Sequence, residues 1–356
     1  MRLIVLPCDG IGPEITTSAI EVLNAADKRF NIGFRYDFEE SGFDSLKKYG
    51  TTLRQETLDK AKDYDGIILG TQSHADYPPP EKGGRNVSAS FRVGLDLYAN
   101  VRPARTRTFL PTNMKPGKTM DLVIMRESTE GFYADRNMTR GWGEVMPSPD
   151  MALATRKITR HCSERIARDS FELAMRRRKK VTAIHKANCF LMTCGLFLES
   201  VRGVAKDFPE VAYDEMIVDA STAHLVRNPE RFDVVCATNF FGDILSDLAS
   251  ELSGSLGLAG STNQNHSHCC AQAQHGSAPD IAGKNIANPT SMILSCAMML
   301  DWGAMRFKRP ELATAAKAID AAVDKVLADP AARTRDLGGA TNCDEFSKRV
   351  AQAVLD

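Results

Sequence analysis

The sequence lacks a long hydrophobic run, an excess of charge of one sign, and paired cysteines. No apolar stretch approaches the roughly 18 residues that a membrane-spanning helix needs. Lysine plus arginine and aspartate plus glutamate each number 45 in 356 residues, so no global field favours nucleic acid or an anionic membrane. The nine cysteines include no CxxC pair, which is typical of a reduced chain rather than a disulfide framework. We therefore expect a cytoplasmic protein with a small-molecule partner, no membrane and no nucleic acid.

The sequence also lacks a dinucleotide-binding fingerprint. The apolar run Arg2 to Leu6 leads into the turn CDGIGPE, which has no third glycine, and no suitably placed acid closes the following strand. We therefore predict no ordinary Rossmann domain. Strand-like runs at 2–6, 34–38 and 66–69 alternate with helical patterns from Pro13 and at 53–61. This alternation predicts α/β layers around a largely buried sheet.

One run, NFFGDILSDLASELSG at 239–254, places two carboxylates four residues apart just after the strand-like run 232–237. Its apolar residues recur at helical spacing, so we expect Asp243 and Asp247 on one helix face, one turn apart. Two such carboxylates repel each other. Either a hard divalent cation lies between them or both are solvated on an outer face, and the spacing leaves both readings open.

Three arginines stand at the ends of predicted strands or helices. Arg92 and Arg102 are ten residues apart, and Arg126 closes the apolar run LVIM, with Tyr133 seven residues further on. Guanidinium grips carboxylates in a planar fork, so the set suits a di- or tricarboxylate. Taken alone, Arg92 and Arg102 could equally be surface residues.

Two further charged residues follow short apolar runs. The run 181–184 ends at His185 and Lys186, and the run 216–218 ends at Asp219. A lysine in this position is commonly a surface charge, but in a dry pocket its pKa falls and it can act as a base. The basic cluster at 176–180 fits a solvated helix end better than a nucleic-acid site.

A histidine- and cysteine-rich segment follows residue 254, and we predict that it is loop from Ser255 through Pro289. It holds His266, His268, Cys269, Cys270 and His275. These residue types invite a zinc interpretation, but their spacing matches no structural zinc pattern.

These motifs together resemble the β-decarboxylating dehydrogenases of 2-hydroxy acids, a family that includes isocitrate, isopropylmalate, homoisocitrate and tartrate dehydrogenases. The resemblance covers almost the whole chain. It is carried, in order, by DGIGPE, LDLYANVRP, RESTEGFY, HKAN, NFFGDILSDLAS, HGSAPDIAGKNIANP and DLGG. It implies an isopropylmalate-dehydrogenase-like α/β fold, in which two domains share one large, twisted, mixed sheet and no Rossmann unit is present.

The resemblance also implies a domain layout. Residues 1–98 with 255–356 would form a large cofactor-binding domain. Residues 99–254 would form a small domain that makes the interface of a homodimer and carries a projecting arm at about 131–149. Active sites in such a dimer would be shared, so the implied roles depend on two copies of the chain.

Roles follow from the resemblance residue by residue. Arg92, Arg102 and Arg126 would hold the carboxylates of the substrate. Lys186 would take the hydroxyl proton, and Tyr133 would protonate the enol carbon or relay that proton.

A divalent metal is implied as well. Mg²⁺ or Mn²⁺ would be bound by Asp243 and Asp247 of one subunit and by Asp219 of the other. Asp219 would also be a catalytic residue. The activity would be oxidative decarboxylation of a 2-hydroxy di- or tricarboxylic acid to a 2-oxo acid, CO₂ and NADH. A non-catalytic regulatory or metabolite-binding subunit is the alternative, although the lysine, the tyrosine and all three aspartates are present.

The segment 275–288 matches the adenosine-binding segment of the family. An acid at 280 would accept the ribose hydroxyls of NAD⁺ and repel a 2′-phosphate, so we predict NAD as the cofactor. One departure lies just upstream, where Gln272, Ala273 and Gln274 replace the usual Glu-Pro-x. The residues expected to contact the cofactor are His275, Gly276, Ser277, Ala278, Asp280, Ile281 and Asn288.

Substrate choice in the family depends on the residues just before the first arginine. Here Asn86 and Ser88 stand where isopropylmalate enzymes have leucines, and they would bury an isopropyl group poorly. We therefore expect both to contact a polar substituent, as in isocitrate, homoisocitrate, tartrate or malate.

Overall fold

The computed structural model describes residues 1–133, 135, 137–138 and 141–356. These residues divide into two compact units. Unit 1 comprises Met1–Leu97, Arg107–Pro111 and Ser255–Asp356, and unit 2 comprises Tyr98–Thr106 and Thr112–Gly254. The fold is mixed α/β with a large mixed sheet of ten strands, which confirms the predicted fold class. Within the described residues, no helix combines the length and the apolar character that crossing a bilayer requires.

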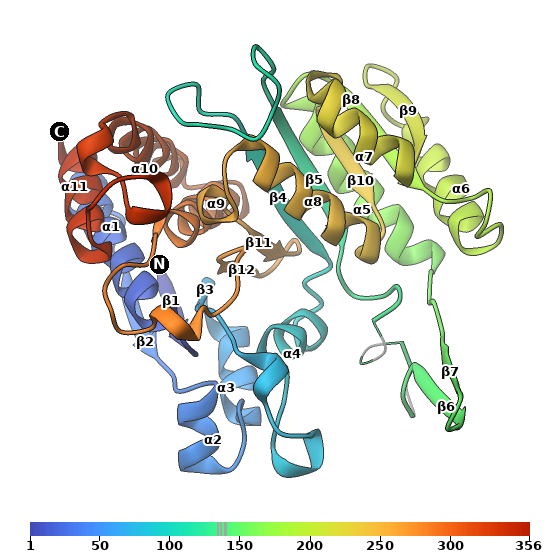
Figure 1. Cartoon of the computed structure of the whole chain (residues 1–356), viewed down its shortest axis with the longest axis horizontal. Helices are drawn as coiled ribbons and strands as arrows, with labels where there is room; N and C mark the ends of the chain where they lie inside the picture. The colour runs from blue at the N-terminus through green and yellow to red at the C-terminus, as the bar shows by residue number, and fades with distance from the viewer. Residues whose placement is uncertain (134, 136, 139–140) are drawn as a thin grey trace. The chain divides into compact units, whose positions relative to one another are not determined.

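Five strands of the sheet belong to unit 1, in the order β2-β1-β3-β12-β11 (Figure 1). They are β1 (Arg2–Leu6), β2 (Arg35–Phe38), β3 (Gly66–Leu69), β11 (Thr262–Gln264) and β12 (Cys269–Gln272). β1 pairs in parallel with β2 and β3, and β3 pairs in parallel with β12, whereas β11 is antiparallel to β12. Nearly every residue of β1 and β3 is buried, which explains why both are continuous apolar runs.

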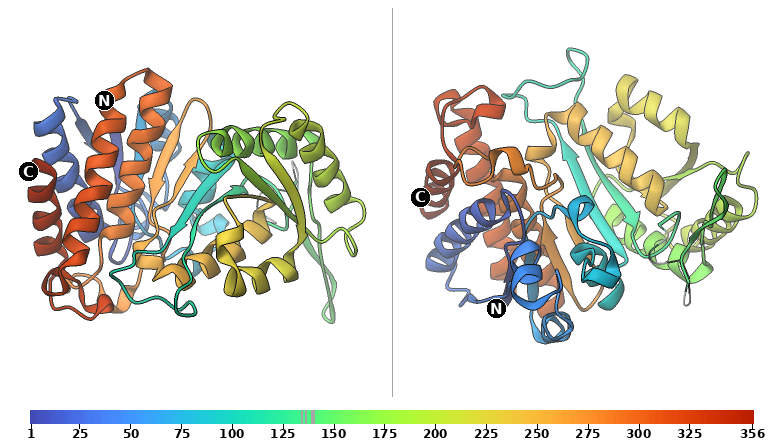
Figure 2. Two further views of the ribbon diagram at one scale, coloured as in Figure 1. Left: turned by 90° about the horizontal axis from the view of Figure 1, so that it is seen from above. Right: turned by 60° about the horizontal axis from the view of Figure 1, so that its bottom comes forward.

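Helices cover both faces of these strands. They are α1 (Gly12–Phe30), α2 (Phe43–Tyr49), α3 (Gln55–Lys60), α4 (Val87–Gly94), α9 (Thr290–Phe307), α10 (Pro310–Ala328) and α11 (Cys343–Leu355). Alternate residues of β1 face opposite ways. Leu3 and Val5 pack with α1, α9, α10 and α11, which run side by side (Figure 2), whereas Ile4 and Leu6 pack with α3 and α4.

The predicted unbroken loop from Ser255 to Pro289 is wrong, because β11 and β12 form a hairpin inside it. β12 is short and has polar residues on both sides in the sequence, so no apolar run marks it as a strand. Its cysteines are small buried side chains on opposite faces: Cys269 joins the core beneath α9, and Cys270 joins the core beneath α4. Both thiols are free and buried, which suits packing rather than metal binding.

Unit 2 holds the other five strands, in the order β4-β5-β10-β8-β9. They are β4 (Ala99–Arg105), β5 (Asp121–Glu127), β8 (Lys180–His185), β9 (Ala212–Ile217) and β10 (Val234–Ala237). β4 is antiparallel to β5, and the other pairs are parallel. Since β5, β8 and β10 run the same way, their carboxyl ends meet at one edge. Arg126, Lys186 and Asn239 lie in or just after those ends.

Both faces of the unit 2 strands are also covered. The helices are α5 (Arg160–Met175), α6 (Thr193–Ala205), α7 (Val218–Arg227) and α8 (Asn239–Ser253). Val123 and Met125 of β5 pack with α5 and α6, whereas Leu122 and Ile124 pack on the side of α7 and α8 (Figure 1). This alternation places α8 directly against the strands that carry the candidate site.

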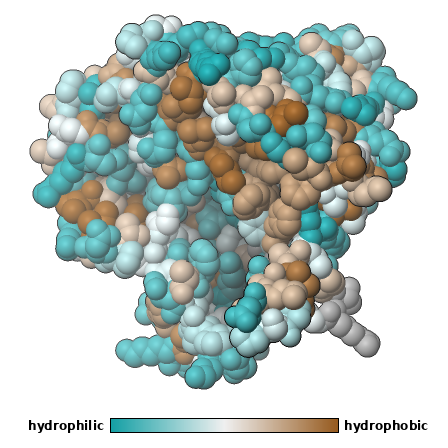
Figure 3. Space-filling view, turned by 45° about the vertical axis from the view of Figure 1, so that its right-hand side comes forward, coloured by the Kyte–Doolittle hydropathy of each residue, from teal (hydrophilic) through white to brown (hydrophobic). Residues whose placement is uncertain are grey.

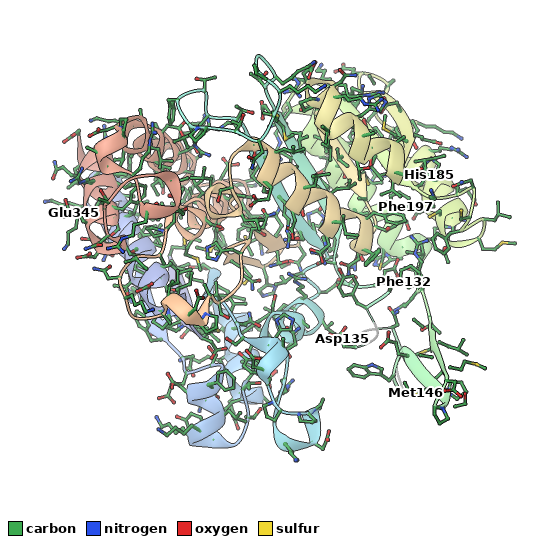
Figure 4. All side chains as sticks on the ribbon, viewed as in Figure 1. Phe132, Asp135, Met146, His185, Phe197 and Glu345 are labelled. Carbon is green, nitrogen blue, oxygen red and sulfur yellow. The ribbon has the colours of Figure 1, made fainter. Side chains whose placement is uncertain are left out.

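A small antiparallel hairpin, β6 (Glu144–Ser148) and β7 (Met151–Ala154), lies outside the core of unit 2. All its strand residues are exposed, and Met146 is 70% exposed. Figure 4 shows Met146 on this hairpin, apart from Phe197 in the core. The hairpin overlaps the predicted arm, of which residues 134, 136, 139 and 140 lie outside the described residues.

Candidate active site

Helix α8 and two neighbouring strands bring four of the predicted site residues of unit 2 together. Asp243 and Asp247 lie one turn apart on α8, as the spacing predicts. β4 and β5 supply Arg102 and Arg126, which are only 8% and 2% exposed. In the antiparallel register Arg102 lies opposite Ile124, so the two arginines are diagonal neighbours on one face.

Hydrogen bonds join these groups to Tyr133. Oδ1 of Asp243 accepts from Nη1 of Arg126 and, at 3.2 Å, from Nη1 of Arg102. Arg102 also donates to Oδ1 of Asp247 at 3.0 Å. The Tyr133 hydroxyl donates to Oδ2 of Asp243 at 2.6 Å and accepts from Nη2 of Arg126 at 2.8 Å. Asp243 is thus the centre of the cluster.

The positive charges of Arg102 and Arg126 are buried side by side, and the carboxylates of Asp243 and Asp247 compensate them. Burial, and then the nearby charge of Arg126, lowers the pKa of Arg102 to about 10, while Asp243 and Asp247 oppose this shift. Nε of Arg126 also donates to Oδ1 of Asn239 at 2.8 Å, which fixes the fork in place. The cluster therefore presents a rigid pair of cations to any carboxylate that competes with the two aspartates.

The two aspartates also fit part of a site for a hard divalent cation. Their carboxylate oxygens are the donors that Mg²⁺ and Mn²⁺ prefer, and their side chains are 35% and 52% exposed. Within the described part of the chain, no three His, Cys, Asp or Glu side chains come together as a metal-binding group. α8 therefore offers two carboxylates that could hold such an ion, and a complete site would need further ligands from outside this cluster.

Lys186 and Asp219 form a separate pair. Lys186 follows β8, and Asp219 lies in the first turn of α7. Nζ of Lys186 donates to Oδ1 of Asp219 at 2.6 Å, and this bond raises the pKa of the lysine and lowers that of the aspartate. The carboxylate of Asp219 is 67% exposed, so it is accessible to another molecule.

In unit 1, α4 carries three predicted site residues. Asn86 is the N-cap, and its Oδ1 accepts from the backbone N–H of Ala89 at 2.9 Å. Ser88 and Arg92 are one turn apart and share a face of the helix. Ser88 also contacts Gln72, a buried polar residue after β3 that the sequence analysis missed. Its signal was a polar side chain three residues after a buried strand.

The predicted cofactor segment lies in unit 1 and packs on the turn after β1. The Ile11 backbone N–H donates to the Ser277 carbonyl at 2.9 Å. Gly10 has φ +60°, and a Cβ there would lie 2.0 Å from that carbonyl oxygen, so only glycine fits. The turn CDGIGPE and the segment HGSAP are therefore one structural feature.

The rest of this segment is anchored by Asp336, which the sequence analysis did not single out within the closing DLGG. Its Oδ2 accepts from Nδ2 of Asn288 at 2.9 Å. Burial lowers the pKa of His275, which keeps its ring neutral. Asp280 is exposed in the short turn Pro279–Ile281, next to Ala278 with φ 39°. An exposed acid beside the apolar Ile281 suits ribose hydroxyls better than a phosphate.

The sequence is similar to a known family of dehydrogenases over almost its whole length. A sequence model described as isocitrate/isopropylmalate dehydrogenase matches residues 2–350. The chain is 41% identical to a 3-isopropylmalate dehydrogenase of Archaeoglobus fulgidus, over 100% of this chain and 99% of the relative. It is 40% identical to an isocitrate/homoisocitrate dehydrogenase of Thermus thermophilus, over 99% and 98% of the two chains.

A solved structure agrees with these relatives. The crystal structure of isocitrate dehydrogenase from Methylococcus capsulatus matches with a TM-score of 0.87 and 37% identity, over 100% of this chain and 99% of that one. Sequence and structure thus agree along the whole length. The chain belongs to the isocitrate/isopropylmalate dehydrogenase family.

Proposed function

We propose that this protein is an NAD⁺-dependent and divalent-metal-dependent dehydrogenase that oxidatively decarboxylates a 2-hydroxy di- or tricarboxylic acid. Its membership of a family of dehydrogenases supports an oxidoreductase. The observation that carries the finer proposal is Asp243, held at once by two buried guanidinium groups and the Tyr133 hydroxyl. The free cysteines support a reducing, cytoplasmic location.

The arginines would bind and orient the substrate. Arg102 and Arg126 are buried and planar, so a carboxylate that reaches them is held in a defined plane. Arg92, which lies on α4, would hold a further carboxylate of the substrate. Such orientation is what hydride transfer to a nicotinamide needs, because a misplacement of about 1 Å can cost about 100-fold in rate.

Asp243 and Asp247, with Asp219 of a second copy of the chain, would hold Mg²⁺ or Mn²⁺. The bound ion would polarise the hydroxyl oxygen and the ketone oxygen derived from it. The present ion pairs favour such an exchange of partners: an anionic substrate can replace the aspartates on Arg102 and Arg126, which leaves the aspartates available to a cation.

Proton transfer would belong to Lys186 and Tyr133. Asp219 raises the pKa of Lys186 in the free chain, so the lysine becomes a base only when Asp219 bonds elsewhere. The Tyr133 hydroxyl donates to Asp243 and accepts from Arg126, so it lies among the groups that would hold the substrate, where it would protonate the enol carbon left by the loss of CO₂.

A homodimer would complete the site. Apolar side chains stay exposed near the carboxyl ends of β8 and β10; they are Phe190, Leu191, Met192, Phe240 and Ile244. Figure 3 shows apolar side chains scattered among polar ones on the face turned to the viewer. Exposed apolar residues that adjoin Lys186 support a surface that a second copy covers.

Cofactor preference is tested at Asp280. Replacing Asp280 with lysine should raise the KM for NAD⁺ about tenfold, because the acid that accepts ribose hydroxyls is lost, and should lower the KM for NADP⁺. Steady-state kinetics with both cofactors measure the change. Unchanged preference in the Asp280→Lys variant would remove the argument for NAD⁺, and Asp356→Lys at the far end of α11 is the control.

The reaction itself is tested by a substrate screen. The protein is incubated with NAD⁺, Mn²⁺ and one acid at a time: isocitrate, homoisocitrate, 3-isopropylmalate, D-malate or tartrate. The absorbance of NADH is followed over minutes. At least one acid should give NADH and CO₂, and a chelator should abolish the rate. Binding of an acid without any turnover would instead support a regulatory subunit.

A further inference from the structure

Gln72 lies three residues beyond the carboxyl end of β3 and is only 9% exposed. The neighbouring parallel strand β12 ends at Gln272, which pairs with Leu69, the last residue of β3. The two glutamines are therefore at the same edge of the unit 1 strands. In α/β proteins this edge, beyond the carboxyl ends of parallel strands, is where ligands bind.

The carboxamide of Gln72 has a defined orientation. Its Oε1 accepts from the backbone N–H of Ser88 at 2.9 Å. A backbone N–H can only donate, so the opposite orientation of the amide would set two donors against each other. Nε2 is therefore turned away from Ser88, and it is buried without a hydrogen-bond partner among the described residues. Such a donor needs an acceptor.

A second carboxamide is held by the same serine. Oγ of Ser88 donates to Oε1 of Gln272 at 2.9 Å, and Nδ2 of Asn263 donates to the same oxygen at 3.3 Å. The carbonyl oxygens of both glutamines are thus occupied, and their NH₂ groups are the ends left for a ligand. Gln272, like Gln72, carries no negative charge. Arg92, one turn beyond Ser88 on α4, adds a positive charge to this face.

We propose that Gln72 is a specificity-determining residue whose NH₂ group donates to a carboxylate on the branch of the substrate. The protein would then select hydroxy tricarboxylates and disfavour hydroxy acids with an apolar branch, such as 3-isopropylmalate. An apolar branch leaves the buried amide donor unpaired, and sites that hydrogen-bond their substrate discriminate strongly against analogues that lack the bonding group. This inference rests on the proposed function and names its substrate class.

The test uses the variant Gln72→Glu in the full-length protein. Glutamate keeps the oxygen that accepts from Ser88 and replaces the donor with an anionic oxygen, which repels a carboxylate. We expect kcat/KM for isocitrate or homoisocitrate to fall at least about 100-fold and that for D-malate, which has no branch, to change less than about threefold. Titration calorimetry with Mn²⁺ and without NAD⁺ should show the same loss of tricarboxylate binding. Gln352→Glu, on the exposed face of α11, is the matched control.

Each other outcome overturns the inference. An equal fall in kcat/KM for all the acids means that Gln72 only supports the fold. A rise in the KM for NAD⁺ with an unchanged ratio between acids places the amide against the cofactor. No change at all means that a buried water satisfies Nε2. If the unmodified protein oxidises none of the acids, the proposed function fails first; if it prefers 3-isopropylmalate, only this inference fails. Gln72→Met gives a second reading should the glutamate variant not fold.

Discussion

Replacing Asp243 with asparagine is expected to destabilise the protein by about 3 kcal/mol and to abolish most of its activity. The stability loss arises because Arg102 and Arg126 are buried and both donate to this carboxylate. This loss lies at the low end for a broken buried ion pair because the Asp243 side chain is 35% exposed. Activity should fall at least about 100-fold, since disturbing even an indirect partner of a metal ligand costs 10- to 100-fold.

Asp247→Asn separates the two effects. Asp247 lies one turn further along α8, its side chain is 52% exposed, and it accepts a hydrogen bond from Arg102. Its replacement should cost at most about 1 kcal/mol while lowering activity as strongly. Chemical denaturation and Mn²⁺ titration of both variants make the measurement. Equal stability losses would contradict the central place of Asp243, and unchanged Mn²⁺ affinity in both would contradict the metal site.

Replacing Lys186 with methionine is expected to lower kcat about 10³-fold and to leave the melting temperature unchanged. The catalytic loss is expected because the variant lacks the amine that we propose as the base for the hydroxyl proton. The fold should not respond, because the pair of Lys186 and Asp219 lies on the surface, with the aspartate 67% exposed.

A suitable control is Lys348→Met, which breaks an exposed ion pair with Asp344 on α11. It should change neither kcat nor the melting temperature. Small primary amines added to the Lys186→Met variant should restore part of the rate, which a purely structural role could not explain. Full activity of the Lys186→Met variant would exclude this lysine as the base.

Local pattern was sufficient for much of the fold. The strands 2–6 and 66–69 have the predicted bounds, because continuous apolar runs are what strands covered on both faces require. Helical spacing likewise placed Asp243 and Asp247 one turn apart on α8. Both results depend on residues that are close together in the chain.

Other features were invisible in the sequence because they depend on distant partners. β12 is a strand through its parallel pairing with β3 and the burial of its cysteines, although its neighbours are polar. Asp336 anchors Asn288 from 48 residues away. No local period signals either contact, so both escaped prediction.

The amino-acid sequence by itself determined the type of the strongly patterned elements, the family motifs and the spacing of the paired aspartates, since these follow from local periodicity and residue chemistry. Only the tertiary structure decided which groups meet: two buried guanidinium groups on Asp243, and Ser88 between Gln72 and a glutamine 184 residues further along the chain. The physical reason is that the partner of a buried polar group is chosen by packing, and packing joins segments whose separation in the chain no local pattern records.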